Sequence, residues 1–347
     1  MTIRVLVADD SAAQRALLVA MLESDPGIRV VGEAASGSEA VEMALHLRPD
    51  LVTMDIHMPV LDGFEATREI MARAPVPIVI VSSSVRRDDI AHSLRAIEVG
   101  ALTAVARPDG PDSPRFEEDR AQLVATVRAM ADVKVVRRWN RAAEPPALRF
   151  PAPGPPLRSV VRLVAVAAST GGPLALQKIL SGLPATFPVP VLIVQHLSRG
   201  FVAVLAEWLN SSAHLRVRVA EAGEHLAAGT VYLAPDDRHL GVSSAGTVVL
   251  DDSVPVEGFR PSASHLFASA ARAYGDGLVA LVLTGMGRDG VRGLQEASRA
   301  GARVLAQDEA SSVIYGMPGE AVRAGVVEEV LPVERIAARL VEMAGGA

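Results

Sequence analysis

Three residues that together could carry out nucleophilic hydrolysis each stand just after a short apolar run. They are Ser169, which follows the apolar run 163–168, His196, which follows the run 189–194, and Asp289, which follows the run 278–283. A serine hydroxyl becomes a nucleophile when a histidine accepts its proton and an acid orients that histidine. Apolar runs of this length are typical of buried parallel strands, whose carboxyl ends share one edge of a sheet. The three side chains can therefore meet although they are far apart in the sequence.

The loop that carries Ser169 has two interpretations. It reads Ser-Thr-Gly-Gly-Pro and joins the first apolar run to a helical segment at 174–180. One interpretation is a nucleophile turn, close to G-x-S-x-G but with Ala167 in place of the first glycine. The other is a phosphate-binding loop at the start of a helix. Pro173 suits either one, because a proline in the first helical turn loses no hydrogen bond.

Other residues compete for the roles of base and acid. His239 lies in a polar turn and is the strongest rival of His196, whereas Asp236 and Asp308 compete with Asp289. We favour His196 because it directly ends an apolar strand. We favour Asp289 because its loop is rich in glycine, so that backbone can approach a ligand closely. The chain order Ser…His…Asp differs from that of the α/β-hydrolases, so this is not an ordinary lipase or esterase.

The first part of the chain alternates apolar runs with helical segments. We expect strands at 3–8, 28–34, 51–54, 78–81 and 101–106, and helices at 11–23, 38–47, 62–73 and 88–99. Ser11 is the expected N-cap of the first helix. Such regular alternation predicts a parallel, doubly wound sheet whose ligand site lies at the carboxyl ends of its strands.

Acidic residues collect at that edge of the predicted sheet. Asp9 and Asp10 end the first strand and Asp55 ends the third. Any one of them alone would be interpreted as a solvated acid at the start of a loop. Three converging carboxylates repel one another unless a cation neutralises them, and oxygen ligands of this kind suit Mg²⁺. The sequence therefore predicts a magnesium site.

Over roughly residues 1–120 the chain resembles the response-regulator receiver domain. The matching motifs are Leu6-Val-Ala-Asp-Asp-Ser11, Met54-Asp-Ile-His-Met-Pro59 followed by Asp62-Gly63, and Val81-Ser-Ser83. The resemblance implies a flavodoxin-like fold, Asp55 as the phospho-acceptor and as a ligand of Mg²⁺ with Asp9 and Asp10, and Ser82 as a hydrogen-bond donor to the phosphoryl group. It also implies a histidine kinase as phosphodonor.

Arg107 departs from the receiver pattern, which has a lysine before the proline of the fifth strand. A planar guanidinium binds phosphate but is not equivalent to a compact ammonium group. The replacement puts in question how phosphorylation is coupled to a change of conformation.

Length and composition indicate two domains and a linker. The chain has 347 residues, no cysteine and a net charge of −6, and a proline-dense stretch between 130 and 159 interrupts the pattern of strands and helices. We expect a receiver domain at 1–125, a linker at 126–158 and a catalytic domain at 159–347. The charge argues against nucleic acid as a partner. With neither an apolar window of membrane length nor a signal peptide, we expect a cytoplasmic protein without membrane insertion.

Nearly the whole chain resembles the chemotaxis receptor methylesterases, the protein-glutamate methylesterase/glutaminases. The matching motifs are Ala168-Ser-Thr-Gly-Gly172, Gln195-His196, Ala234-Pro-Asp-Asp-Arg-His239, Arg260-Pro-Ser262, Leu283-Thr-Gly-Met-Gly-Arg-Asp-Gly290, Ala306-Gln-Asp-Glu-Ala-Ser311 and Tyr315-Gly-Met-Pro318. The resemblance implies a receiver fused to a Rossmann-like hydrolase with a mostly parallel sheet. It assigns Ser169 as nucleophile, His196 as general base and Asp289 as the acid that orients it.

The expected fold is thus α/β, with two doubly wound, three-layer domains. The expected activity is a phosphorylation-regulated carboxylic ester hydrolysis that removes methyl groups from glutamyl esters on the cytoplasmic helices of chemoreceptors and deamidates glutamines there. The hydrolysis itself needs no metal. We expect the backbone N–H groups of Thr170 and Met286, both in loops of small residues, to bind the oxyanion.

Two alternatives remain open from the sequence. The chain could be a receiver-controlled binding module that holds a nucleotide on the Ser169 loop, although the expected acidic ribose partner about twenty residues further on is absent. It could also be the same hydrolase acting on a receptor system outside chemotaxis. Residues 256–259 lack the polar and basic character that the family usually has before Arg-Pro-Ser, which could alter the choice of substrate.

Overall fold

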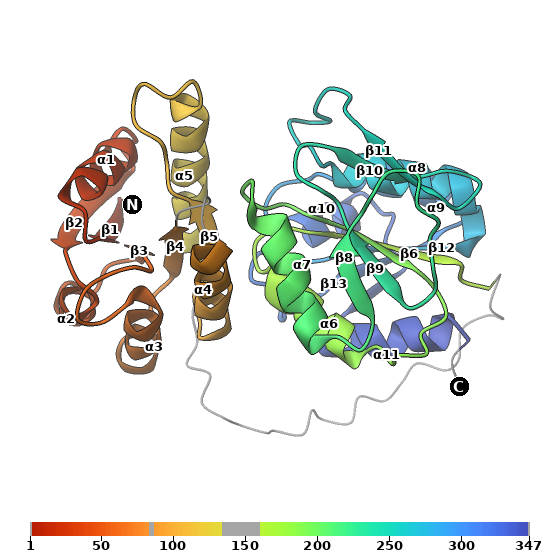
Figure 1. Ribbon diagram of the computed structural model, residues 1–347, viewed down its shortest axis with the longest axis horizontal. Helices are drawn as coiled ribbons and strands as arrows, with labels where there is room; N and C mark the ends of the chain where they lie inside the picture. The colour runs from red at the N-terminus through yellow and green to blue at the C-terminus, as the bar shows by residue number, and fades with distance from the viewer. Residues whose placement is uncertain (1, 83–86, 134–159, 346–347) are drawn as a thin grey trace.

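Two α/β domains lie side by side in the computed structural model, which describes residues 2–82, 87–133 and 160–345 (Figure 1). Most of the expected linker therefore lies outside the described residues. In the described part of the chain no helix combines the length and the apolar character needed to cross a membrane.

The first domain is a five-stranded parallel sheet in the order β2-β1-β3-β4-β5. Its strands are β1 (Ile3–Ala8), β2 (Ile28–Ala34), β3 (Leu51–Met54), β4 (Ile78–Ser82) and β5 (Thr103–Ala106). Its helices are α1 (Ala12–Glu23), α2 (Gly37–Leu47), α3 (Gly63–Arg73), α4 (Arg87–Glu98) and α5 (Phe116–Ala131). The strand order reverses between β1 and β3, which is where ligands bind in open α/β sheets. The predicted doubly wound fold is confirmed.

Alternation along β1 explains why this sheet has helices on both faces. Val5 and Val7 belong to a core with α1 and α5, whereas Leu6 and Ala8 face a second core with α2, α3 and α4. Successive side chains of a strand point to opposite faces, so a continuously apolar strand requires cover on both. Helix α5 continues to Ala131, and the first domain therefore extends beyond the boundary expected at residue 125.

The second domain is a seven-stranded sheet in the order β14-β13-β12-β6-β7-β9-β8, in which every pair is parallel. Its strands are β6 (Leu163–Ala168), β7 (Val191–Gln195), β8 (Arg216–Val219), β9 (Thr230–Leu233), β12 (Leu278–Val282), β13 (Arg303–Gln307) and β14 (Glu329–Leu331). A separate antiparallel hairpin consists of β10 (His239–Val242) and β11 (Val248–Asp251).

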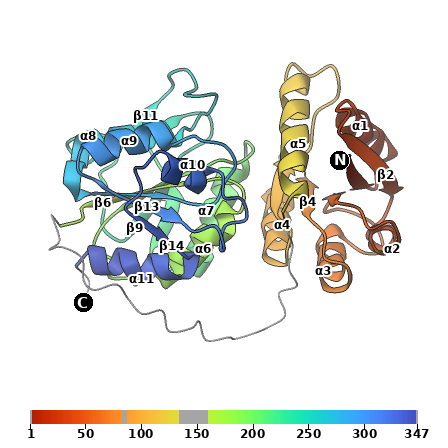
Figure 2. The ribbon, with the colours of Figure 1, turned by 180° about the vertical axis from the view of Figure 1, so that it is seen from behind.

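Helices cover both faces of this sheet as well. One face carries α6 (Gly172–Gly182), α7 (Phe201–Ser212) and α11 (Val333–Met343), and the other carries α8 (Ala263–Tyr274), α9 (Val291–Arg299) and α10 (Met317–Arg323) (Figures 1 and 2). The strand order reverses at β6, which lies between β12 and β7. The loops after these three strands contain Ser169, His196 and Asp289, so the fold brings all three to one switch point.

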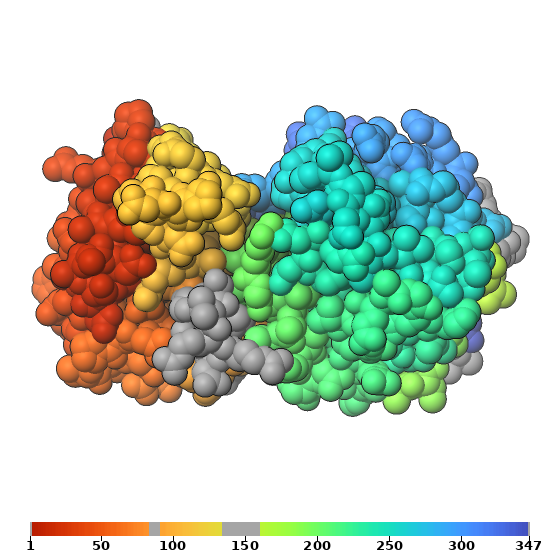
Figure 3. All heavy atoms as spheres, turned by 45° about the horizontal axis from the view of Figure 1, so that its top comes forward, coloured from red at the N-terminus to blue at the C-terminus, as the bar shows by residue number. Residues whose placement is uncertain are grey.

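The two domains touch through α4 and β5. Helix α4 packs against α6 and α7, and the carboxylate of Glu98 accepts hydrogen bonds from Trp208 Nε1 (3.0 Å) and Gln177 Nε2 (3.4 Å). The Ala106 N–H donates to Ser198 Oγ at 3.0 Å. Figure 3 shows the domains as two lobes in contact near the middle of the molecule. Ser198 is only two residues from His196, so the first domain contacts the loop that follows β7.

Candidate active site

The Asp289 carboxylate is buried at the N-terminus of α8 and fully hydrogen-bonded. Oδ1 accepts from Ser262 Oγ (2.9 Å) and the Ser264 N–H (3.0 Å), and Oδ2 accepts from the Ala263 N–H (2.7 Å). Oδ2 also lies 3.0 Å from His196 Nε2. Burial by itself raises the pKa of Asp289, but the hydrogen bonds from His196 and the two backbone amides outweigh it and lower the pKa below its usual value. Asp289 is therefore an anion held in a fixed orientation.

His196 is held by that anion through one ring nitrogen. Because the carboxylate only accepts, Nε2 carries the proton and Nδ1 is left with a lone pair. Nδ1 is buried and has no hydrogen-bond partner among the residues that the structure describes. The Phe259 ring stacks on the imidazole, with centroids 4.4 Å apart and planes inclined by 12°. The imidazole thus has the tautomer of a general base, with Nδ1 as the free acceptor.

The backbone around Ser169 is tied to β7 and β12. Its N–H donates to Thr284 O (3.0 Å), and its carbonyl accepts from Gln195 Nε2 (2.8 Å). The same Gln195 nitrogen donates to the His196 carbonyl at 2.9 Å, so one side-chain amide joins the two loops. Among the described residues no hydrogen bond links Ser169 Oγ with His196, and catalytic contacts in a ligand-free enzyme often tighten only when substrate binds.

Thr284 fixes the two loops that contain the candidate oxyanion donors. Its Oγ1 donates to the Thr170 carbonyl (2.8 Å) and accepts from the Ile314 N–H (3.0 Å). In the described part of the chain neither the Thr170 N–H nor the Met286 N–H donates to a protein acceptor. Both amides are therefore available to a ligand.

The rival residues are occupied elsewhere. His239 is fully buried, and its ring accepts from the Ser262 N–H (3.2 Å) and contacts the Val254 carbonyl (3.2 Å). Asp236 accepts from the Gly200 N–H at the start of α7, and Asp308 accepts from Ser311. These hydrogen bonds give all three rivals a structural role. His239 supports the site indirectly, because Ser262 in turn donates to Asp289.

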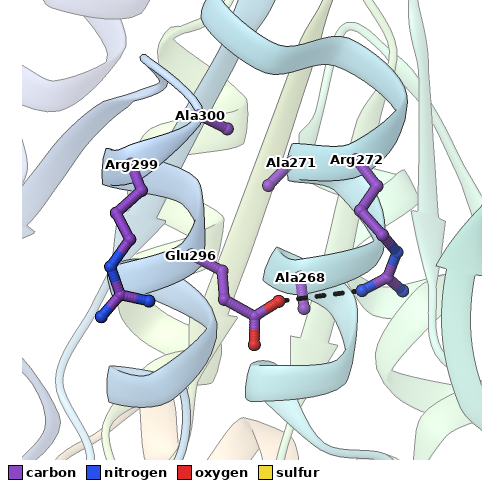
Figure 4. Close-up of a pocket in the computed structure, with 6 residues that line it drawn as sticks. All are labelled: Ala268, Ala271, Arg272, Glu296, Arg299 and Ala300. Carbon is purple, nitrogen blue, oxygen red and sulfur yellow. Dashed lines mark ion pairs between the residues drawn. The ribbon is translucent and has the colours of Figure 1, made fainter.

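A pocket of this domain lies away from these residues. It is between α8 and α9, where Arg272 and Glu296 form an ion pair of 3.7 Å across alanines (Figure 4). It includes Ala300, at the opposite end of α9 from Asp289. Exposed ion pairs of this kind add little stability, and none of the site residues described above lines this pocket.

In the first domain, Asp9, Asp10 and Asp55 converge as expected from the sequence. One oxygen from each lies within 4.8 Å of the others, and Asp9 Oδ2 is buried and accepts no hydrogen bond from the described part of the chain. A buried carboxylate oxygen that accepts no hydrogen bond and lies among other acids fits a hard divalent cation. Arg107 Nη2 lies 2.6 Å from Asp55 Oδ1 and 3.4 Å from Asp9 Oδ2. Burial raises the pKa of Asp55 to about 6, although Arg107 opposes the shift.

The Ser82 side chain is buried, and its carbonyl accepts from the Arg107 N–H at 2.7 Å. Ser82 ends β4 and Arg107 follows β5, so both residues reach the same sheet edge as Asp55. The structure thus brings Asp9, Asp10, Asp55, Ser82 and Arg107 to one edge of the sheet, whereas Ser83 of the third receiver motif lies outside the described residues.

Comparisons with known proteins agree with this architecture. A family model described as CheB methylesterase matches residues 164–340, and one described as response regulator receiver domain matches residues 5–113. A protein-glutamate methylesterase/protein-glutamine glutaminase 4 of Myxococcus xanthus is 53% identical over 340 residues, 97% of this chain and 96% of that protein. A protein of the same name from Geobacter metallireducens is 47% identical over 347 residues, 99% of each. The crystal structure of the Thermotoga maritima CheB methylesterase catalytic domain has a TM-score of 0.52 and 38% identity, covering 53% of this chain and 100% of that one.

A receiver domain joined to an α/β hydrolase domain defines a response regulator whose output is enzymatic. The chain belongs to the CheB methylesterase family. It is an enzyme, a carboxylic ester hydrolase, as the resemblance implied.

Proposed function

We propose that the chain hydrolyses glutamyl γ-methyl esters on the cytoplasmic helices of chemoreceptors through Ser169, His196 and Asp289. The observation that carries this proposal is the hydrogen-bonded His196–Asp289 pair at the same switch point as the Ser169 loop. The names of the full-length relatives supply the substrate class. By the same route the enzyme deamidates glutamine side chains, with ammonia in place of methanol as the leaving group.

The reaction has two halves. His196 Nδ1 takes the Ser169 proton as Oγ attacks the ester carbonyl, and Asp289 stabilises the imidazolium through Nε2. The amides of Thr170 and Met286 hydrogen-bond the oxyanion, a contribution worth on the order of a hundredfold in rate for each donor. The intermediate collapses to an acyl-enzyme as His196 returns the proton to methanol. Water then attacks with His196 again as base, which releases glutamate and restores Ser169.

The decisive experiment is to incubate the purified protein with methylated receptor fragments and to measure released methanol. Methanol formation that requires Ser169 supports the hydrolase. If the protein binds a nucleotide and releases no methanol, the binding-module alternative holds instead.

Gly285→Ala tests the close packing behind the nucleophile. A Cβ at Gly285 would lie 2.7 Å from Ser169 Cβ and 2.5 Å from Met317 Sδ, so the Ser169 loop has to move. A displacement of about 1 Å costs on the order of a hundredfold in rate, and we expect that loss in methanol release with an unchanged circular dichroism spectrum. Gly110→Ala is the control, because no atom lies within 4 Å of the added Cβ. Equal rates for the two variants would contradict the proposed position of Ser169.

Phosphorylation at Asp55 controls the hydrolase in this proposal. Asp9, Asp10 and Asp55 would hold Mg²⁺, which when bound supplies positive charge for the acceptor carboxylate and the incoming phosphoryl group. The guanidinium of Arg107, already 2.6 Å from Asp55, is placed to bind the phosphoryl oxygens. A histidine kinase is the phosphodonor. The unphosphorylated receiver restrains the loop after β7 through Ser198.

Glu98→Ala is expected to raise the basal activity of the full-length, unphosphorylated protein. Glu98 accepts the hydrogen bonds from Trp208 and Gln177 that join α4 to α7 and α6. Losing hydrogen bonds to a charged acceptor favours the separated domains, and we expect an increase of roughly three- to tenfold in methanol release. Glu118→Ala, which removes an exposed acid of α5 that pairs with Arg115 of the same domain, should leave the rate unchanged. A basal rate of Glu98→Ala equal to that of the parent protein would argue against restraint by the receiver.

A further inference from the structure

We propose that Phe259 is a positioning residue for the histidine base, a role that rests on the proposed function. Its ring lies nearly parallel to the imidazole of His196, with centroids 4.4 Å apart. Phe259 belongs to residues 256–259, the stretch whose sequence departs from the polar and basic character expected before Arg-Pro-Ser. One residue of the stretch that departs from the family pattern therefore contacts the proposed base directly.

The backbone holds Phe259 firmly in this position. Val256 and Phe259 exchange both of their N–H···O hydrogen bonds, each 3.0 Å long. The two residues between them, Glu257 and Gly258, have φ values of 53° and 88°, as in the tight turns that suit β-hairpins. Three residues after Phe259 comes Ser262, which donates to Asp289. One short segment thus supplies both the aromatic cover of the imidazole and a donor that orients the acid.

The imidazole needs this cover because a single hydrogen bond does not fix its plane. Nε2 is bound to Asp289, but Nδ1 has no partner in the described structure, so the ring could rock about the Nε2 contact. A flat ring stacked on one face restricts that motion and keeps Nδ1 directed for proton transfer. When His196 becomes an imidazolium, the electron-rich face of Phe259 also attracts its positive charge. Both effects act on the chemical step rather than on substrate binding.

The test compares Phe259→Leu with Phe259→Tyr in the full-length protein. Leucine keeps an apolar side chain but has no ring, whereas tyrosine keeps the ring. For Phe259→Leu we expect kcat for methanol release from methylated receptor fragments to fall roughly three- to tenfold, the scale of a stacked aromatic pair, with KM unchanged. Phe259→Tyr, which keeps the ring, should have the kcat of the parent protein. Val254→Ala, which shortens an exposed side chain of the same loop, is the matched control and should behave as the parent.

Nuclear magnetic resonance supplies a readout that is independent of turnover. The ring current of Phe259 should shift the carbon-bound imidazole protons of His196 upfield in the parent and in Phe259→Tyr, and the shift should vanish in Phe259→Leu. The proposal is overturned if the leucine variant keeps the parental kcat, if its loss appears only in KM, or if the His196 resonances do not change. If the parent releases no methanol at all, the hydrolase proposal itself fails and this inference falls with it.

Discussion

Replacing Ser169 by alanine is expected to abolish methanol release while the fold remains intact. Removing the nucleophile of a hydrolytic triad costs on the order of 10⁴- to 10⁶-fold in kcat, because no other group can form the acyl-enzyme. The Ser169 side chain is half-buried and its Oγ makes no hydrogen bond in the described structure, whereas the backbone contacts to Thr284, Gly172 and Gln195 do not involve it. Alanine therefore removes the chemistry and leaves the loop in place.

The control for this experiment is Ser181→Ala. Ser181 is an exposed serine in α6, and its hydroxyl donates to the Lys178 carbonyl one turn earlier. Its loss should leave the rate unchanged, and both variants should unfold at the temperature of the parent. Methanol release by Ser169→Ala at more than a few per cent of the parental rate would remove the nucleophile assignment.

Asp289→Asn is expected to have the second largest effect, a loss on the order of 10³- to 10⁴-fold in kcat. The carboxylate accepts from Ser262, from two backbone amides and from His196. An asparagine amide group cannot accept at both positions, so its NH₂ faces a donor and the favoured histidine tautomer is lost. Asp252→Asn is the control, because Asp252 is an exposed acid that binds Arg238. Parental kcat in Asp289→Asn would show that another acid orients the base.

The same substitution should also destabilise the protein in a pH-dependent way. The pKa of Asp289 is lower in the folded protein than its ordinary value of 3.8. The ionised form therefore stabilises the fold above about pH 4, and this contribution is lost as the pH falls through the lower folded pKa. The free energy of unfolding of Asp289→Asn should lie below that of the parent at pH 7, and the gap should narrow toward pH 3. Urea unfolding at both pH values measures it, and a gap that widens on acidification would contradict the lowered pKa.

Much of this architecture could be predicted from local sequence patterns. The apolar runs 3–8, 28–34 and 163–168 coincide with strands β1, β2 and β6, and Ser11 caps α1 as expected. These predictions succeed because a buried parallel strand is almost purely apolar and ends abruptly in polar residues. The same rule selects the candidate site residues, since strand ends share one edge of the sheet.

Residues whose role depends on register or loop path could not be found in this way. Gln195 lies beside Ala168 only because β6 and β7 pair in that register, and the sequence shows no more than a glutamine at the end of an apolar run. Phe259 comes 63 residues after His196 in the sequence, so no periodicity links its ring to the imidazole. Helix α5 (Phe116–Ala131) is absent from the helices expected from the sequence, and it runs past residue 126, where the linker is expected to begin.

Adjacent residues at the end of β5 face in two directions. The guanidinium of Arg107 binds Asp55, while the amide of Ala106 binds the hydroxyl of Ser198 in the other domain. A single peptide unit thus separates the Arg107 side chain, which binds Asp55, from the Ala106 amide, which binds the second domain. If phosphorylation of Asp55 controls the hydrolase as proposed, a displacement of Arg107 would reach the contact with Ser198 through one peptide unit, without a relay through the protein core.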